Sequence, residues 1–262
     1  MYNYFIQAYA TYKGLFYWLN WPGYISNVFL RPIVMVLTYA LLGRFALSPE
    51  AARDYALGVG IYSMMFILVG AISQSYTYDR SQGTIAFLFI SPANRLVNYL
   101  SRMALHLPNA LLVFVFGFGT AWLLVDINFG LVNWGAFVLS IVITAASIAA
   151  FGQAVGVVAI AVRNWLNTFG LILGLFIAFT GVIIPLSVFP PVVREICKIL
   201  PMTNGLAATK LAFAGGAFSS VWSPVLREAL TGLVYLALGY IGFGVFERVV
   251  KHNGSLDAET TN

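Results

Sequence analysis

Two long stretches of this chain carry no charged residue, and they limit what it can fold into. Residues 127–162 and 164–193 contain no Asp, Glu, Lys or Arg. A helix that spans the hydrocarbon core of a bilayer needs about 20 apolar residues, and both stretches are longer than that. Only 9% of the chain is charged and 60% is hydrophobic, whereas about 25% of an average soluble domain is charged. The chain is therefore predicted to be an integral membrane protein.

Six apolar stretches are long enough to span a bilayer, and they predict an all-α membrane protein. Spanning segments must satisfy their backbone hydrogen bonds internally, and the alternating strands of a membrane barrel do not occur in this sequence. The predicted transmembrane helices cover about residues 28–47, 56–77, 103–125, 134–162, 166–189 and 227–249. They form one transmembrane domain over residues 1–250, followed by a short polar tail over residues 251–262.

The beginning of the chain is rich in aromatic rings, which predicts a helix at the membrane surface. Eight aromatic side chains and a single charge, Lys13, lie between residues 2 and 20. Such rings favour the headgroup region of a bilayer. We therefore expect an interfacial helix here, and we expect Pro22 and Gly23 to turn the chain into the membrane.

The distribution of Lys and Arg predicts how the chain crosses the membrane, because cytoplasmic loops carry the excess of positive charge. With a cytoplasmic N-terminus, eight basic residues fall on the inner side and six on the outer side. We expect a multi-pass protein of the plasma membrane with both termini in the cytoplasm. The basic residues are scattered singly, which argues against a nucleic-acid partner.

The predicted inner loop, residues 78–102, is too long to be a simple connection. Its core holds, in order, Asp79, Arg80, Gly83, Thr84, the apolar residues 85–90, Ser91 and Pro92. The apolar run predicts about two helical turns that the proline ends. Five large apolar side chains on so short a helix need a surface to pack against. Either the helix lies on the lipid headgroups, or it docks into a groove on another protein.

The predicted outer loop, residues 187–224, is also long, and prolines interrupt the chain in and before it. These prolines are Pro185, Pro190, Pro191 and Pro201. Between and after them, the pattern predicts two short amphipathic helices, over residues 192–200 and 206–213. They form either a passive outer cap or part of an exit gate.

The sequence lacks the motifs that a chemical step would need. A phosphate-binding loop requires a Gly-Lys pair, which is absent, and the single cysteine excludes an internal disulfide. No histidine spacing fits a metal, and His106 is expected to be a polar contact between helices. We therefore expect no catalytic residue, metal or cofactor on this chain. Ion-driven carriers usually hold Asp or Glu within their spans, and here the middle of every predicted span is free of them. Uphill transport would then draw its energy from another protein.

Three motifs follow one another along the six spans. The first is the inner-loop series from Asp79 to Pro92. The second runs from Thr180-Gly181 through Pro185 to Leu200-Pro201, and the third is Gly239-Tyr240 with Glu247-Arg248. In this order they resemble the membrane subunit of ABC transporters of the ABC-2 (type-2 permease) family. That family includes drug-resistance permeases of the daunorubicin type, lipid exporters and polysaccharide exporters.

The resemblance implies six helices after an interfacial helix, with short outer-leaflet helices between the fifth and sixth spans. Two permease copies, identical or related, would face each other around a pathway. Two cytosolic ABC ATPase subunits, which hold ATP and Mg²⁺, would bind beneath. The ATPase-coupling residues would be Asp79, Arg80, Gly83, Thr84, Phe87, Ser91 and Pro92. The outer gate would contain Gly181, Pro185, Phe189, Pro190 and Pro201.

The expected function is ATP-driven export of a hydrophobic or amphipathic molecule, such as a drug, antibiotic or lipid, because the spans carry few charges. A lipid-linked polysaccharide or glycolipid is the alternative substrate. Two other classes remain open. One is a channel or secondary carrier that works without an ATPase. The other is an intramembrane enzyme, which would need a nucleophile–base pair, with His106 as the one candidate base within a span.

Overall fold

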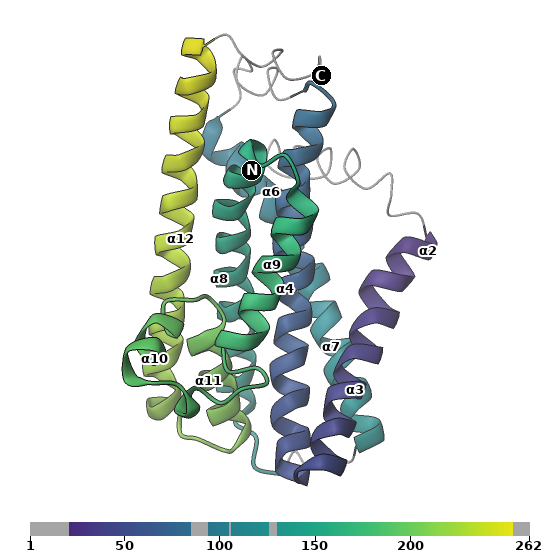
Figure 1. The fold of residues 1–262 in the computed structure, drawn as a ribbon. Coiled ribbons are helices and arrows are strands. Elements are labelled where there is room, and N and C mark those ends of the chain that lie inside the picture. The colour runs from purple at the N-terminus through teal and green to yellow at the C-terminus, as the bar shows by residue number, and fades with distance from the viewer. Residues whose placement is uncertain (1–20, 85–93, 105, 126–129, 254–262) are drawn as a thin grey trace.

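A computed structural model describes residues 21–84, 94–104, 106–125 and 130–253 of the chain. Every regular element in these ranges is a helix (Figure 1). In chain order they are α2 (Trp21–Tyr24), η2 (Ile25–Leu30), α3 (Arg31–Ala46), α4 (Pro49–Ser81), α6 (Arg95–Ala104), α7 (His106–Val125), α8 (Trp134–Ala161), α9 (Trp165–Phe179), η3 (Leu186–Val188), α10 (Pro191–Cys197), α11 (Thr203–Phe213) and α12 (Phe218–Asn253). The predicted all-α class is confirmed for this part of the chain.

Five helical segments of the described chain are long and apolar enough to cross a membrane. They are Pro22–Ala46, Pro49–Ser81, Arg95–Leu124, Trp134–Ala161 and Phe218–Val249. These segments correspond to the first, second, third, fourth and sixth predicted spans. The second, third and sixth start earlier than predicted, because hydropathy places a boundary at the nearest charge while the helix continues past it. Helix α4 ends at Ser81 and α6 begins at Arg95, so both helices reach into the predicted inner loop, residues 78–102.

The predicted fifth span, residues 166–189, is wrong in its length. Helix α9 has 15 residues and ends at Phe179, so it rises about 22 Å, less than the roughly 30 Å hydrocarbon core. The chain then bends through residues 180–184. Gly181 adopts φ +82°, a conformation that side chains with a Cβ disfavour. Pro185 follows and lacks the N–H that would continue a helix.

The start of the first span also differs from the expectation. Pro22 and Gly23 lie inside helix α2 and do not form a turn. Proline suits the first turn of a helix, where its missing N–H would have no partner. From there α2, the π-helical η2 and α3 follow one another without interruption. The predicted interfacial helix over residues 2–20 lies outside the described residues. Residues 251–253, assigned to the polar tail, continue helix α12.

Helix α4 lies at the centre of the bundle, between α3 and α8 (Figure 1). All residues from Ala56 to Met65 in this helix are buried. The approach of α8 to α4 is close, since a Cβ on Gly156 would lie 2.5 Å from Cδ2 of Tyr76. A Cβ on Gly152 would lie 3.2 Å from Cα of Val69. These two glycines, four residues apart, therefore let the helices pack closely together.

The two ends of the bundle differ in what they carry (Figure 1). At one end, here named the loop end, α4, α8 and α12 finish and α6 and α9 begin. At the other end, named the cap end, the chain turns from α3 into α4, and α10 and α11 lie beside the start of α12. The described part of the inner-loop motif, residues 79–84, is thus at the loop end, and the proline-rich segment is at the cap end.

Candidate functional site

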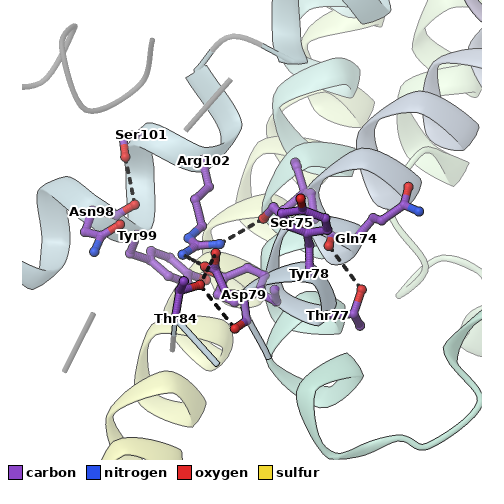
Figure 2. Close-up of polar contacts among 12 residues, drawn as sticks. Gln74, Ser75, Thr77, Tyr78, Asp79, Thr84, Asn98, Tyr99, Ser101 and Arg102 are labelled. Atoms are coloured by element: carbon purple, nitrogen blue, oxygen red, sulfur yellow. Dashed lines mark hydrogen bonds and ion pairs between the residues drawn. The ribbon is translucent and has the colours of Figure 1, made fainter. Parts of the chain in front are cut away.

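The inner loop leaves the bundle from a buried ion pair (Figure 2). The guanidinium of Arg102 in α6 donates to Oδ2 of Asp79 in the last turns of α4. It also donates to Oγ of Ser75 at 3.0 Å, and it lies 4.3 Å from the ring centroid of Tyr76. The side chain of Arg102 is only 4% exposed. A buried charge of this kind depends on its partner, so the pair holds the two ends of the loop together.

A single buried amide joins this pair to a third helix. The hydroxyl of Tyr76 donates to Oε1 of Gln153 in α8 at 2.7 Å. The amide nitrogen of Gln153 in turn donates to the backbone carbonyl of Tyr99 in α6. Gln153 is fully buried, and both its oxygen and its nitrogen are used. It therefore fixes α4 and α6 to α8 at the same level.

Helix α12 is attached to the same structure. The hydroxyl of Tyr99 donates to the carbonyl of Leu236 at 3.2 Å, and its ring contacts the ring of Tyr240 at 5.6 Å between centroids. Nearer the loop, Arg95 at the start of α6 forms an ion pair of 2.9 Å with Glu247 of α12. We name the whole set of contacts the polar clamp. Its members are Ser75, Tyr76, Asp79, Tyr99, Arg102 and Gln153, with Arg95 and Glu247 at its edge.

Gly83 and Thr84 end helix α4 in a way that explains their place in the motif. The N–H of Gly83 donates to the carbonyl of Arg80 at 3.1 Å, and the N–H of Thr84 donates to the carbonyl of Asp79 at 2.9 Å. This pair of bonds is the Schellman motif, which requires a left-handed residue after the helix. Gly83 has φ +66° and supplies that residue. The hydroxyl of Thr84 also lies 3.4 Å from Oδ1 of Asp79.

The predicted coupling residues divide into two groups. Asp79, Arg80, Gly83 and Thr84 lie together at the base of the loop. Arg80 donates to the carbonyl of Ile160 at 2.6 Å and so ties the end of α4 to the end of α8. Phe87, Ser91 and Pro92 lie outside the described residues, so their predicted contact with an ATPase stays a prediction.

The sequence did not predict the members of the polar clamp that lie on α6 and α8. The predicted coupling residues include Asp79 but not its partner Arg102, and they include neither Tyr99 nor Gln153. One signal was available: Gln153 is a polar residue inside a charge-free run, and polar groups within spans usually have partners.

At the cap end, the predicted gate residues line the path from α9 to α11. Gly181 lies in the bend after α9, and Pro185 precedes η3. Phe189 stacks on Phe179 with 5.5 Å between ring centroids. Pro190 precedes α10, and Pro201 is buried in the turn before α11. The two predicted amphipathic helices are observed as α10 and α11. Most side chains of α11 are buried within the protein, so this helix is packed more deeply than a surface helix.

A cavity of about 180 Å³ lies in the loop-end half of the bundle. Its described lining comes from α2, η2, α4, α7 and α9, namely Tyr24, Asn27, Val28, Phe66, Ile67, Gly70, Ala71, Gln74, His106, Asn109, Trp165, Leu166 and Phe169. None of these residues is an Asp, Glu, Lys or Arg. The hydroxyl of Tyr24 donates to Oδ1 of Asn109 at 3.1 Å. The cavity thus combines aromatic walls with neutral polar groups, and it suits an uncharged amphipathic molecule.

Comparison with known proteins assigns the family. The family model described as ABC-2 type transporter matches residues 6–213. The match includes the base of the inner loop, the bend after α9 and the cap helices α10 and α11. A search of the curated proteins found no match. The resemblance drawn from the three motifs is confirmed, and the chain belongs to the ABC-2 type transporter family as a multi-pass membrane permease of an ABC transporter.

Proposed function

We propose that this permease is the transmembrane subunit of an ATP-driven exporter. It has no ATPase of its own and works with two copies of a cytosolic ABC ATPase subunit, which hold ATP and Mg²⁺. Two permease copies enclose the pathway in the plasma membrane, with the loop end in the cytoplasm. The membership of the ABC-2 family supports this assignment.

The polar clamp is the observation that carries the proposal. A motor that pushes on a loop moves the bundle only if the loop is rigidly attached to the spans. Here the ion pair between Asp79 and Arg102 closes the loop at its base. Gln153 fixes both neighbouring helices to α8, and Tyr99 reaches α12. Force on the loop therefore acts on four helices together.

The coupling segment is the part of the loop between Gly83 and Ile90. Its apolar residues dock on the ATPase, and Phe87 lies at the centre of that run in the sequence. The Schellman turn at Gly83 sets the direction in which the segment leaves α4. Closure of the ATPase pair on ATP moves the segment and shifts the two permease copies.

The lining of the cavity supports a hydrophobic or amphipathic substrate without a net charge. Its volume of about 180 Å³ is below the 300–1,000 Å³ of typical drug-sized sites. It fits one ring system or one headgroup, with the rest of the molecule in the bilayer. A lipid-linked polysaccharide or glycolipid is the second candidate, since the amides of Asn27, Gln74 and Asn109 can bind sugar hydroxyls.

The remaining alternative is a channel or secondary carrier that needs no ATPase. A carrier driven by protons or cations uses carboxylates that become available during transport. In this permease Asp79 is paired with Arg102, and Glu247 is paired with Arg95. Glu228, which is buried inside α12, accepts two hydrogen bonds from the backbone N–H groups of Met202 and Gly205. These engaged carboxylates favour an external source of energy.

The test is ATP hydrolysis by the reconstituted complex of the permease with its ATPase subunit. A panel of drugs, phospholipids and glycolipids is added, and the hydrolysis rate is measured for each. We expect stimulation by uncharged amphipathic compounds. Stimulation by glycolipids alone would select the polysaccharide alternative. Uphill transport by the permease without any ATPase would contradict the proposal.

A further inference from the structure

Glu228 is a buried carboxylate inside helix α12 that binds the backbone of another helix. Its side chain is 0% exposed. Oε1 accepts the N–H of Met202 at 2.6 Å, and Oε2 accepts the N–H of Gly205 at 2.9 Å. Both N–H groups belong to the beginning of α11, which starts at Thr203. Sequence reasoning placed Glu228 at the start of a span, but α12 begins at Phe218, so this residue lies about three turns inside it.

The first N–H groups of α11 need a hydrogen-bond acceptor from outside this helix. The first N–H groups of a helix have no partner within the helix, and a side chain at the N-cap usually accepts one of them. Here the N-cap is Met202, which makes no side-chain cap bond. Met202 also has φ +76°, which a residue with a Cβ adopts only when its surroundings hold it there. The carboxylate of Glu228 takes the place of the missing cap.

Helix α11 is also packed against α8 along its length. A Cβ on Gly205 would lie 2.0 Å from Oγ1 of Thr144, so only glycine fits where α11 meets α8. At the other end of α11, the N–H of Asn133 donates to the carbonyl of Ala212 at 3.0 Å. Its side-chain amide donates to the carbonyl of Gly216 at 3.1 Å. The cap helix is thus joined to both α8 and α12.

The opposite end of α12 is attached to the element that leads out of the inner loop. Glu247 pairs with Arg95 at the start of α6, and Leu236 accepts from Tyr99. Glu228 and Glu247 are 19 residues apart in one continuous helix, which corresponds to about 28 Å, close to the thickness of the hydrocarbon core. The proline of this helix, Pro224, lies before Glu228 and so outside that stretch.

We propose that α12 is a rod that carries the movement of the inner loop to the cap helix α11, and that Glu228 is the positioning residue at its cap end. The inference rests on the proposed function, because the movement starts at an ATPase on the loop. Displacement of α6 pulls on Glu247, α12 moves as one body, and Glu228 takes α11 with it. The exit side then opens in step with ATP binding at the loop end.

The experiment measures distances between spin labels in the reconstituted permease–ATPase complex, first with ADP and then with ATP and vanadate. Cys197 is the single cysteine and is replaced by Ser. Two label pairs are used at exposed positions. Ala207 with Leu230 reports α11 against α12, and Ala207 with Phe45 reports α11 against the end of α3. In the parent protein we expect ATP to shift the Ala207–Phe45 distance and to leave the Ala207–Leu230 distance unchanged.

Glu228→Gln is the main variant, because it keeps the volume and removes one acceptor and the charge. We expect it to abolish the ATP-dependent shift between Ala207 and Phe45, or to transfer it to the Ala207–Leu230 pair. Glu228→Asp, which keeps the charge, restores the shift in part. Thr209→Val is the control, since it removes a buried hydrogen bond to the carbonyl of Gly205 within α11, which is not one of the two bonds that Glu228 accepts.

Three outcomes would contradict the proposal that α12 carries movement to α11. They are a parent-like ATP response in Glu228→Gln, the same loss in Thr209→Val, and no ATP-dependent shift in a parent complex that hydrolyses ATP. Measuring ATP hydrolysis by the same complex distinguishes a failure of the proposal for α12 from a failure of the proposed function. A permease that binds no ATPase and supports no ATP hydrolysis would instead refute the proposed function itself.

Discussion

Asp79 of α4 and Arg102 of α6 form an ion pair that closes the inner loop at its base. The pair lies next to the Schellman turn at Gly83 that ends α4. Arg102 is almost entirely buried, with Tyr76 against its guanidinium and Ser75 accepting a hydrogen bond. The ion pair therefore fixes α6 to the last turns of α4, on the two sides of the inner loop.

Replacing Asp79 by Asn is expected to lower the free energy of unfolding by about 3 kcal/mol, because Arg102 is left buried without a counter-charge. Thermal unfolding of the detergent-solubilised permease measures the change. The double variant Asp79→Asn with Arg102→Gln should be less destabilised than the sum of the single variants.

The matched control for this pair is Arg53 with Asp54 at the cap end. Their side chains are about a third exposed, and exposed ion pairs contribute only about 0–1 kcal/mol. Arg53→Gln should therefore change stability by less than 1 kcal/mol. Equal losses at the two pairs would contradict the role given to burial of Arg102.

Gly83→Ala is expected to weaken the binding of the ATPase subunit and to cost about 1 kcal/mol of stability, since Gly83 has φ +66°. A methyl group there would meet no atom within 4 Å, so the effect is conformational and not steric. Gly83→Asn is the control, because Asn tolerates the left-handed conformation. Co-purification of the ATPase with each variant measures binding. Full binding by the Ala variant would show that the turn does not orient the segment.

Phe87→Glu should leave membrane insertion intact and reduce ATPase association and transport at least tenfold, because it places a charge within the apolar docking run. Ser81→Glu adds the same charge at an exposed position before the loop and serves as the control. Association is measured by co-purification and transport in liposomes. Normal transport by Phe87→Glu would refute docking through this run.

Asn109→Asp is expected to change substrate preference towards cations, because it adds a negative charge to a cavity lined by neutral groups. The hydroxyl of Tyr24 can still donate to the new carboxylate. We expect the ratio of ATPase stimulation by a cationic amphiphile to stimulation by its uncharged analogue to rise about tenfold, or 1.4 kcal/mol. An unchanged ratio would show that the substrate does not pass this cavity.

Cys197 reports on the fold of the cap end. Its side chain is 1% exposed, and burial raises the pKa of its thiol. The thiol is therefore neutral at pH 7, and its reaction with a maleimide should be at least 100-fold slower in the native protein than in dodecyl sulfate. Mass spectrometry of the labelled fraction over time gives both rates. Equally fast labelling would mean that Cys197 is not buried in the native protein.

Much of the fold follows from apolar length alone. The predicted fourth span, residues 134–162, matches α8, Trp134–Ala161, almost to the residue. The charge-free run over residues 164–193 misled the span prediction because hydropathy does not register where a helix breaks. Gly181 and Pro185 were the local signal that α9 would end early, and they were interpreted as part of a gate motif.

The contacts between side chains in the site could not be predicted from the sequence. Tyr76 and Gln153 are 77 residues apart, and their contact is set by how closely two glycines let α8 approach α4. The predicted sixth span, residues 227–249, puts Glu228 at a membrane boundary, because hydropathy starts the span at the nearest charges. The partners of Glu228 are backbone N–H groups at the start of α11. Nearly every residue has such a group, so the identity of the residues does not predict which N–H group a carboxylate binds.

The central claim is that this permease moves its substrate only when an ATPase acts on the inner loop. The most direct measurement is uptake of an uncharged fluorescent amphiphile into sealed liposomes, with the permease alone and with the permease–ATPase complex supplied with ATP. We expect accumulation against the gradient only with the complex and ATP, and we expect its loss when Phe87 is replaced by Glu. Accumulation with the permease alone would contradict ATP-driven export.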